Sequence, residues 1–294
     1  MYRDNWRLHG EQQLGDLRIG ELTASRANTH LKALPPSVAA SLRVTLVGMY
    51  ALAGRFDVVK HNPIWATKTA KPDPITARAL TGMEFEQVRQ AVKAFCAQRG
   101  PGPRRAPMLA AFVELLAATG ARPGEVLALR WEDVDLLADP PTVTLSGTII
   151  DAGKVAGKVA GKPLHRQDVR KLDAPAHTAA LPEFGVRALA DLYAITGPDG
   201  TVLKNRDGGL LSLSNIRSSL REALASHEHL AWVTPRSFRK TAATVVRDGL
   251  GVEAAQRQLS HKQLATTEQH YVQRVTAGPD TRAVLDKWAS NGTD

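Results

Sequence analysis

The chain contains a single cysteine, Cys96, among 294 residues, so no disulfide can form within it. Such a sequence suits a reducing compartment. Cys96 lies in the apolar-periodic run VRQAVKAFCA, which favours a packed thiol over a reactive one. The segment MYRDNWRLHGEQQ lacks the apolar core of a signal peptide, and we recognise no apolar stretch long enough to span a bilayer. These absences predict a cytoplasmic protein without a membrane partner.

Motifs for nucleotide and metal chemistry are also missing. There is no GxxxxGK[ST] phosphate loop, so ATP use is not implied. The segment SHEHL offers His227 and His229, but residues two apart do not share a helix face, and no further ligands have suitable spacing. The acids of WEDVD (131–135) do not form the converging carboxylate set of a two-metal nuclease. We therefore expect no cofactor and no metal.

Basic residues, in contrast, are abundant. The sequence has 38 Lys and Arg against 29 Asp and Glu, a net charge of +9 and a pI near 9.8. Such a balance favours polyanionic partners, nucleic acid first, although a charge spread over the surface for solubility is the alternative. Residues 1–72 hold ten of the basic residues and five acidic ones, so this part is the more basic per residue. That concentration is expected of a module that grips DNA.

Hydrophobic periodicity predicts a helical first domain over residues 1–72. In PPSVAASLRVTLVGMYALAGRFDVV an apolar face recurs at three- and four-residue steps, with Pro35 and Pro36 at the helix start and Gly54 as an interruption. The members of that face are Val38, Leu42, Leu46, Met49 and Leu52. The proline-rich segment 61–76 is typical of an interdomain connection. We assign the linker to 73–80.

The second domain, 81–294, is predicted to be mainly α with a small β-sheet, an α+β arrangement. Its β-branched run PTVTLSGTIID precedes the segment GKVAGKVAGK, a duplicated flexible loop whose Lys154, Lys158 and Lys162 either meet phosphates or are merely solvated. A tail helix carries Val284, Leu285 and Trp288 on one face. The helical patterns lie at about 81–98, 105–118, 183–196, 214–226, 236–249, 252–259 and 279–290.

Two stretches place arginine at the start of a helix. In TGARPGEVLAL, Arg122 precedes Pro123 in the first turn, where a guanidinium and backbone N–H groups can hold one phosphate. The alternative is a surface pair between Arg122 and Glu125. In VTPRSFRKTAATVV, Arg236 and Arg239 lie three residues apart on one face. Two such cations repel each other unless an anion lies between them, although solvent screening can suffice.

A third stretch, LSHKQLATTEQHYVQR, places Tyr271 in polar company. Its hydroxyl is either a nucleophile or simply the wet end of a half-buried ring. Together TGARPGEVLALRW, RKLDAPAHTAALP, TPRSFRKTAAT and LSHKQLATTEQHY resemble, in order and spacing, the motifs of the tyrosine recombinase or phage integrase family. The resemblance covers residues 81–275. Residues 1–72, with LGDLRIGELT, are similar to that family's helical core-binding domain.

The resemblance implies a role for each residue of the predicted site. Tyr271 would attack the scissile DNA phosphate and form a 3′-phosphotyrosine without metal or ATP. Arg122 and Arg239 would clamp the non-bridging oxygens, and Glu125 would support them. His261, in LSH, would hydrogen-bond a phosphate oxygen.

The leaving-group acid is the remaining role. Lys171 matches the lysine that protonates the 5′-oxygen, with Lys162 as second choice. The alternative for Lys171 is a salt bridge to Asp168 or Asp173.

The sequence departs from the family pattern in two features. Arg236 occupies the histidine slot of the second motif, and a guanidinium cannot accept a proton at working pH. The chain also begins within the first helix of the core-binding domain, so we expect this domain to be shortened at its N-terminus; the motifs leave open whether an arm-binding domain is missing.

These departures keep alternatives open. The second hypothesis, beside the recombinase, is a catalytically weak or inactive DNA-binding protein on the same scaffold. A third is a type IB topoisomerase-like relaxing activity, because the chemistry is shared. The resemblance further implies double-stranded DNA as partner, a homotetramer on two duplexes joined through the tail, and accessory DNA-bending or excision factors. A DNA-bound protein would lie in the nucleoid. The target sequence and the direction of reaction are not encoded in these motifs.

Overall fold

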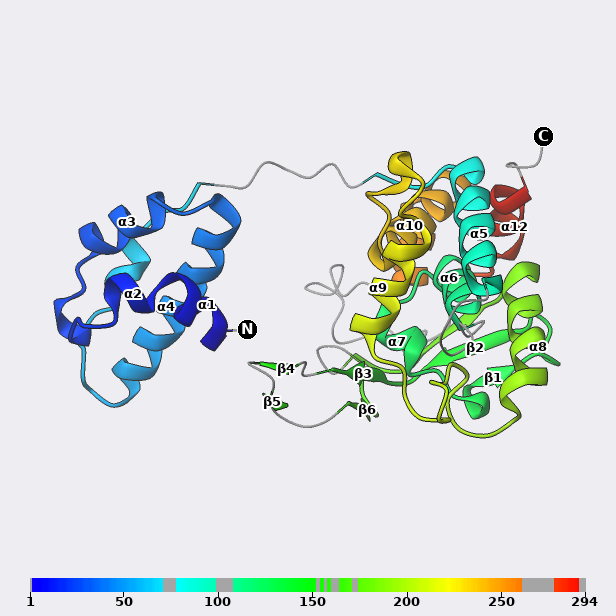
Figure 1. The fold of residues 1–294 in the computed structure, drawn as a ribbon, viewed down its shortest axis with the longest axis horizontal. Coiled ribbons are helices and arrows are strands. Elements are labelled where there is room, and N and C mark those ends of the chain that lie inside the picture. Colours follow the sequence, from blue (N-terminus) through cyan, green and yellow to red (C-terminus); the bar gives the residue numbers. More distant parts are fainter. Residues whose placement is uncertain are drawn as a thin grey trace. The chain divides into compact units, whose positions relative to one another are not determined.

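The computed structural model divides the chain into two compact units, residues 1–76 and 77–294, which are described separately below. Figure 1 shows the helices and strands of each unit. The residues whose structure is described are 2–70, 78–98, 108–151, 154–155, 158–159, 164–170, 174–260 and 278–290.

The first unit is helical, as predicted. Its elements are α1 (Tyr2–His9), α2 (Glu11–Leu14), η1 (Ile19–Glu21), α3 (Ala24–Lys32), α4 (Pro36–Arg55) and η2 (Pro63–Ala66). Leu42 and Leu46 of α4 are buried as expected, but Met49 and Leu52 are 37% and 54% exposed. Tyr50 is buried instead, and α4 continues through Gly54 to Arg55. The predicted apolar face was therefore wrong in its last two turns, because the buried stripe follows Ala39, Leu42, Leu46, Tyr50 and Ala53.

Helix α4 also corrects the expectation about bilayer-spanning stretches. By length and composition alone, its 20 residues, with a mean hydropathy of 1.3, are enough to cross a membrane. The core helix of a globular protein passes the same test, and Leu42 and Leu46 pack in the core of the first unit. Packing therefore accounts for one face of the helix, whereas Val44, Met49 and Leu52 are exposed.

The proline-rich segment does not act as a connection along its whole length. Its first part folds as η2 on the first unit, with Ile64 fully buried and Arg43 donating from Nη2 to the Ile64 carbonyl oxygen over 3.3 Å. The far end of the assigned linker enters the second unit, because Leu80 is buried there and its N–H donates to Thr241 Oγ1 at 2.9 Å. Both ends are thus fixed by contacts that proline content does not reveal.

The second unit is mainly helical and matches the predicted order of elements. The central apolar helix α6 packs against α5, α8 and α10, and Leu115 and Leu116 are fully buried in the core. The helices are α5 (Gly82–Ala97), α6 (Met108–Thr119), α7 (Pro123–Leu127), η3 (Trp131–Asp133), α8 (Glu183–Thr196), α9 (Leu213–Ala223), η4 (Glu228–Leu230), α10 (Pro235–Leu250), α11 (Val252–Leu259) and α12 (Arg282–Ser290).

The strands form three small antiparallel sheets among the described residues, not the single sheet expected. The order β1-β2-β7 makes the largest, β3 pairs with β6, and β4 pairs with β5. The last pair is the duplicated lysine segment, which folds back on itself with Lys154 opposite Val159. Strand bounds are β1 (Val134–Asp135), β2 (Thr142–Leu145), β3 (Thr148–Ile150), β4 (Lys154–Val155), β5 (Lys158–Val159), β6 (His165–Gln167) and β7 (His177–Ala180).

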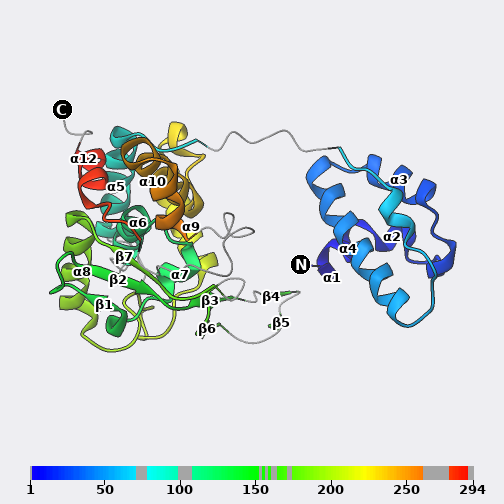
Figure 2. The same ribbon diagram turned by 180° about the vertical axis from the view of Figure 1, so that it is seen from behind.

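The tail helix α12 packs on its own domain beside α5, as Figure 2 shows from behind. The Trp288 ring stacks on Phe85 with centroids 4.4 Å apart, and its Nε1 donates to the Leu80 carbonyl oxygen at 3.3 Å. Leu285 is fully buried. Cys96 of α5 is partly buried against the same core, which confirms its expected role as a packed thiol.

Candidate functional site

The motif TGARPGEVLAL forms a helix start built around Glu125. Pro123 opens the five-residue helix α7, and the Glu125 carboxylate accepts the backbone N–H of Arg122 at 2.9 Å through Oε2. The Arg122 guanidinium donates to the other oxygen, Oε1, at 3.0 Å. The Arg122 side chain is 31% exposed, whereas that of Glu125 is fully buried. The pair considered from the sequence therefore exists, but the buried Glu125 orients a partly open Arg122.

A second arginine reaches the same carboxylate from the strand segment. Arg170 donates from Nε to Glu125 Oε1 at 3.0 Å, and its side chain is only 1% exposed. Its Nη1 donates to the Pro175 carbonyl oxygen at 3.0 Å and to Ser260 Oγ at 3.1 Å. Arg170 is therefore a buried ion whose partners come from three separate parts of the chain.

A third arginine, Arg239, enters from α10. It donates from Nη1 to the Gly120 carbonyl oxygen and from Nη2 to the Leu259 carbonyl oxygen, both at 2.8 Å. Gly120 has a φ of +63°, and a Cβ there would lie 3.0 Å from that of Ala242 and 2.9 Å from Leu259 Cδ2. The turn after α6 thus requires glycine, and it turns the Gly120 carbonyl toward Arg239.

The charges of these residues perturb one another. Burial disfavours ionisation of Glu125, but the charge of Arg170 and the N–H and guanidinium of Arg122 outweigh burial, so the pKa of Glu125 is lowered below its usual value. Burial, together with the like charges of Arg122 and Arg170, lowers the pKa of Arg239 to about 10. Glu125 and Arg239 are therefore both charged at neutral pH.

Three guanidinium groups lie around one carboxylate. Arg122 and Arg170 both pair with Glu125, whereas Arg239 has no ion pair among the described residues. The three cations and one anion leave two positive charges in excess. The partly exposed guanidinium groups of Arg122 and Arg239 favour a tetrahedral oxyanion, because forked donors match its oxygens.

Two more contacts fix the end of α11 beside this cluster. The buried His177 ring of β7 lies 2.9 Å, through Nε2, from the Gln258 carbonyl oxygen. The Gln258 side chain donates from Nε2 to the Thr119 carbonyl oxygen at 3.1 Å. These two contacts join β7, the end of α6 and the end of α11 close to Arg239.

Arg236 does not join these contacts. It is the second residue of α10 and is exposed, and no polar partner for it is found among the described residues. The sequence predicted that Arg236 and Arg239 lie on one helix face. In the structure Arg239 is hydrogen-bonded to the carbonyl oxygens of Gly120 and Leu259, whereas Arg236 is exposed in the first turn of α10. Arg122, Glu125 and Arg239 are thus brought together, and Arg236 stands at their margin.

The remaining predicted residues, Lys171, Lys162, His261 and Tyr271, lie outside the described residues. Their immediate neighbours do not: Arg170 precedes Lys171 and Ser260 precedes His261, and these two side chains are in contact.

A salt bridge between Lys171 and Asp168, the alternative considered from the sequence, would compete with two ion pairs that Asp168 already makes. Asp168 already accepts from Arg130 at 3.0 Å and from Arg166.

Sequence reasoning missed Arg170 and Ser260. Arg170 belongs to the quoted motif RKLDAPAHTAALP, but a lone arginine among polar residues has no periodic signal, and its burial depends on Glu125, 45 residues earlier. Ser260 gives a weak signal, because it replaces the more permissive glycine of the usual LGH at a helix end. Its φ of +50° confirms that this position is left-handed.

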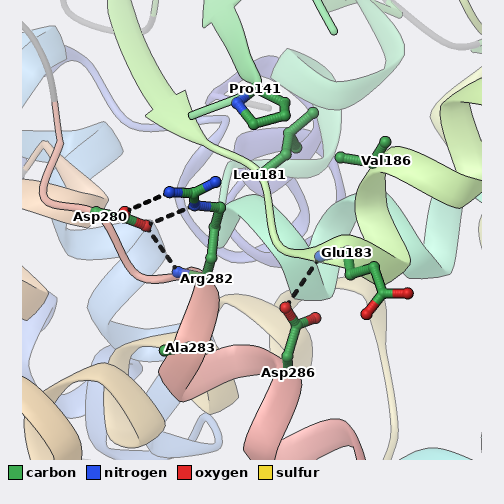
Figure 3. Close-up of a pocket in the computed structure, with 8 residues that line it drawn as sticks. All are labelled: Pro141, Leu181, Glu183, Val186, Asp280, Arg282, Ala283 and Asp286. Atoms are coloured by element: carbon green, nitrogen blue, oxygen red, sulfur yellow. Dashed lines mark hydrogen bonds and ion pairs between the residues drawn. The ribbon is translucent and has the colours of Figure 1, made fainter. Parts of the chain in front are cut away.

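One pocket is separate from these residues. It has a volume of about 530 Å³ between α12, the start of α8 and the ends of β2 and β7. Figure 3 shows Asp286 accepting from the Glu183 N–H and Arg282 held by Asp280. Three carboxylates and one guanidinium make this pocket unsuitable for a phosphate. Its lining is Pro141, Leu181, Glu183, Val186, Asp280, Arg282, Ala283 and Asp286.

The second unit is similar in sequence to known proteins. A family model described as "Phage integrase family" matches residues 81–277. Tyrosine recombinase XerD of Mycobacterium tuberculosis (strain CDC 1551 / Oshkosh) is 29% identical over 180 residues, which are 59% of this chain and 52% of XerD. The chain thus spans about half the length of this relative.

Solved structures share the fold. The Tn1549 transposon integrase in complex with transposon right end DNA superposes with a TM-score of 0.67 at 16% identity, covering 98% of this chain and 92% of that one. A lambda integrase tetramer bound to a Holliday junction gives a TM-score of 0.64 at 17% identity, covering 92% and 73%. The mainly α fold with a minor β component, predicted from the sequence, is therefore confirmed.

Proposed function

This chain belongs to the phage integrase family, and from that membership we propose that it is a tyrosine-type site-specific DNA recombinase. It would cleave and rejoin double-stranded DNA through a 3′-phosphotyrosine. The observation that carries the proposal is the cluster of Arg122, Arg170 and Arg239 around Glu125. These motif positions, far apart in sequence, place uncompensated positive charge where a phosphate is expected.

In the proposed reaction the Tyr271 hydroxyl oxygen attacks phosphorus, and the bond from phosphorus to the 5′-oxygen breaks. The phenol loses its proton and the leaving 5′-oxygen gains one, for which Lys171 is the proposed donor. Arg122 and Arg239 would stabilise the charge that develops on the non-bridging oxygens. His261 would donate a further hydrogen bond. The phosphoester bond energy is retained in the tyrosyl ester, so a freed 5′-hydroxyl can reseal the strand without ATP.

The first unit is proposed as the core-binding domain, with double-stranded DNA as ligand. Its excess of basic residues supports this role. A homotetramer on two duplexes is proposed by analogy with the lambda integrase tetramer, which is described as bound to a Holliday junction. Accessory DNA-bending or excision factors, and an intracellular place of action on the nucleoid, belong to the same proposal.

The exposed Arg236 favours a second candidate, a DNA-binding protein with little chemistry. In the His-x-x-Arg motif this position would carry the group that takes the phenol proton, and a guanidinium cannot do so. It can still bind phosphate and favour the phenolate. The two candidates share DNA binding and differ only in whether a covalent bond forms.

A trapping experiment separates them. The protein is incubated with a pool of duplexes that carry a randomised core and one nick, so that the short fragment released by cleavage diffuses away. We expect a protein–DNA adduct that survives SDS and is absent from Tyr271→Phe, and sequencing the trapped strands would give the target. Retarded DNA with no adduct would leave the binding protein as the function; relaxation of supercoiled plasmid without strand exchange would indicate the topoisomerase-like activity.

A further inference from the structure

We propose that Arg170 is a positioning residue for the reaction: it fixes the phosphate-clamping Arg122 and joins the two segments that continue into Lys171 and His261. This inference rests on the proposed function and extends it to a residue with no assigned role.

The burial and partners of Arg170 are unusual for an arginine. Its side chain is 1% exposed and bonds the fully buried Glu125 carboxylate, the Pro175 carbonyl oxygen and the Ser260 hydroxyl. A buried guanidinium requires partners for its donors, and a flexible lysine could not reach all three groups from one position. Both Nε and Nη1 of the guanidinium therefore donate to groups fixed by the fold.

Each partner leads to a different part of the proposed site. Glu125 accepts the backbone N–H of Arg122 through Oε2 and its guanidinium through Oε1. The hydrogen bond from Arg170 to Oε1 therefore fixes the position of the carboxylate that orients Arg122. Pro175 follows Lys171 by four residues in the sequence, and its carbonyl oxygen accepts from Arg170. Ser260 directly precedes His261 and closes α11.

Ser260 adds a second reason to assign this role. It holds a left-handed backbone with φ +50°, a conformation that disfavours residues other than glycine. Its Oγ is the atom that meets Arg170. Ser260 occupies a position that favours glycine, and its hydroxyl accepts from the buried Arg170 guanidinium. This combination indicates that the contact between Ser260 and Arg170 has a role in the site.

A matched control lies four residues away. Arg166 of β6 is also largely buried, with an 8% exposed side chain that bonds the Ala128 carbonyl oxygen at 2.9 Å and Ser146 Oγ at 2.7 Å. It also pairs with acids, at Asp133 and Asp168, but it contacts no member of the arginine cluster. Each replacement with lysine removes contacts of a buried guanidinium with a carboxylate, a carbonyl oxygen and a serine hydroxyl, but only those of Arg170 involve Glu125.

The test compares Arg170→Lys with Arg166→Lys on the nicked duplex selected by trapping. DNA affinity is measured by titration, and the rate of covalent adduct formation is measured with protein in saturating excess. We expect Arg170→Lys to form the adduct about 10- to 100-fold more slowly, as for slight misplacement of reacting groups, with affinity nearly unchanged. Arg166→Lys should form it at the wild-type rate.

Equal rates for Arg170→Lys and wild type would overturn the inference, as would an equal loss in both variants. If circular dichroism shows that Arg170→Lys does not fold, Ser260→Ala decides: slower adduct formation at unchanged affinity supports the inference, and a wild-type rate overturns it. Wild-type protein that forms no adduct would instead refute the recombinase function itself, and this positioning role with it.

Discussion

Arg239 donates to the carbonyl oxygen of Gly120 over 2.8 Å, across 119 residues of sequence. The contact joins α10 to the glycine turn between α6 and α7. Both halves of the arginine cluster are therefore set by backbone geometry: Gly120 faces Arg239 because its φ is positive, and Arg122 starts α7 two residues later. The positions of these two guanidinium groups are thus determined together.

Replacement of Arg239 by lysine tests this geometry. A single ammonium cannot reach the Gly120 and Leu259 carbonyl oxygens and still present a fork to a phosphate. We expect adduct formation to fall on the order of 10²-fold or more in single-turnover assays. Arg247→Lys on the same helix is the control, because Arg247 is exposed and, among the residues that the structure describes, has an ion pair only with its neighbour Asp248, at 2.9 Å. A similar loss in both variants would contradict a specific role for Arg239.

Arg236→His tests the departure from the motif. An imidazole titrates near pH ~6.5 in model peptides, and its neutral form can accept the phenol proton. The variant should therefore gain activity as the pH rises through that range, while the wild-type profile should have no such step. Rates of adduct formation between pH 5.5 and 8, with Arg236→Ala as control, measure the difference. Superimposable profiles for the histidine and alanine variants would remove proton transfer from the role of this position.

The choice between Lys171 and Lys162 can be decided with a sulfur leaving group. A thiolate leaves without a proton because thiols are far more acidic than alcohols. We expect Lys171→Ala to cleave ordinary DNA about 10²- to 10⁴-fold more slowly and to cleave a duplex with sulfur at the 5′-bridging position at nearly the wild-type rate. Lys162→Ala should match the wild type on both substrates. The reverse pattern would assign proton donation to Lys162.

Glu125→Gln tests the electrostatics of the cluster through stability. The folded-state pKa of Glu125 lies below its usual value of 4.5, so its ionised form stabilises the fold above that pH. This stabilisation is lost as the pH falls through the lower, folded-state value. Glutamine leaves Arg170 buried without its counter-charge, at a cost of about 3–5 kcal/mol at neutral pH.

The measurement is urea unfolding at several pH values. The gap between wild type and Glu125→Gln should be widest at neutral pH and shrink on acidification below pH 4.5. A gap that does not vary with pH would mean that the charge of Glu125 does not stabilise the fold.

Local patterns in the sequence were enough to predict most helices. The segments 183–196 and 252–259 match α8 and α11 residue for residue, because their amphipathic periods and flanking Pro182 and Gly251 are local signals. The strand count was less predictable. Pairing of β3 with β6 depends on residues on either side of the duplicated loop, and short strands have little periodicity.

The site could be predicted only in part, for a similar reason. Arg122, Glu125 and Arg239 stand beside helix-start signals that can be read from the chain. The location of Arg170 cannot, because it depends on Glu125 and Ser260, which are brought near only by the complete fold. The exposed side of α4 was mispredicted because hydrophobicity alone does not tell which of Met49, Tyr50 and Leu52 faces the core.

The stacking of Trp288 on Phe85, and its bond to the Leu80 carbonyl oxygen, bring the first and last helices of the second unit together. A domain whose ends lie close together can be fused to different partner domains without a change to its core. It can also be circularly permuted, with a short peptide joining the original ends.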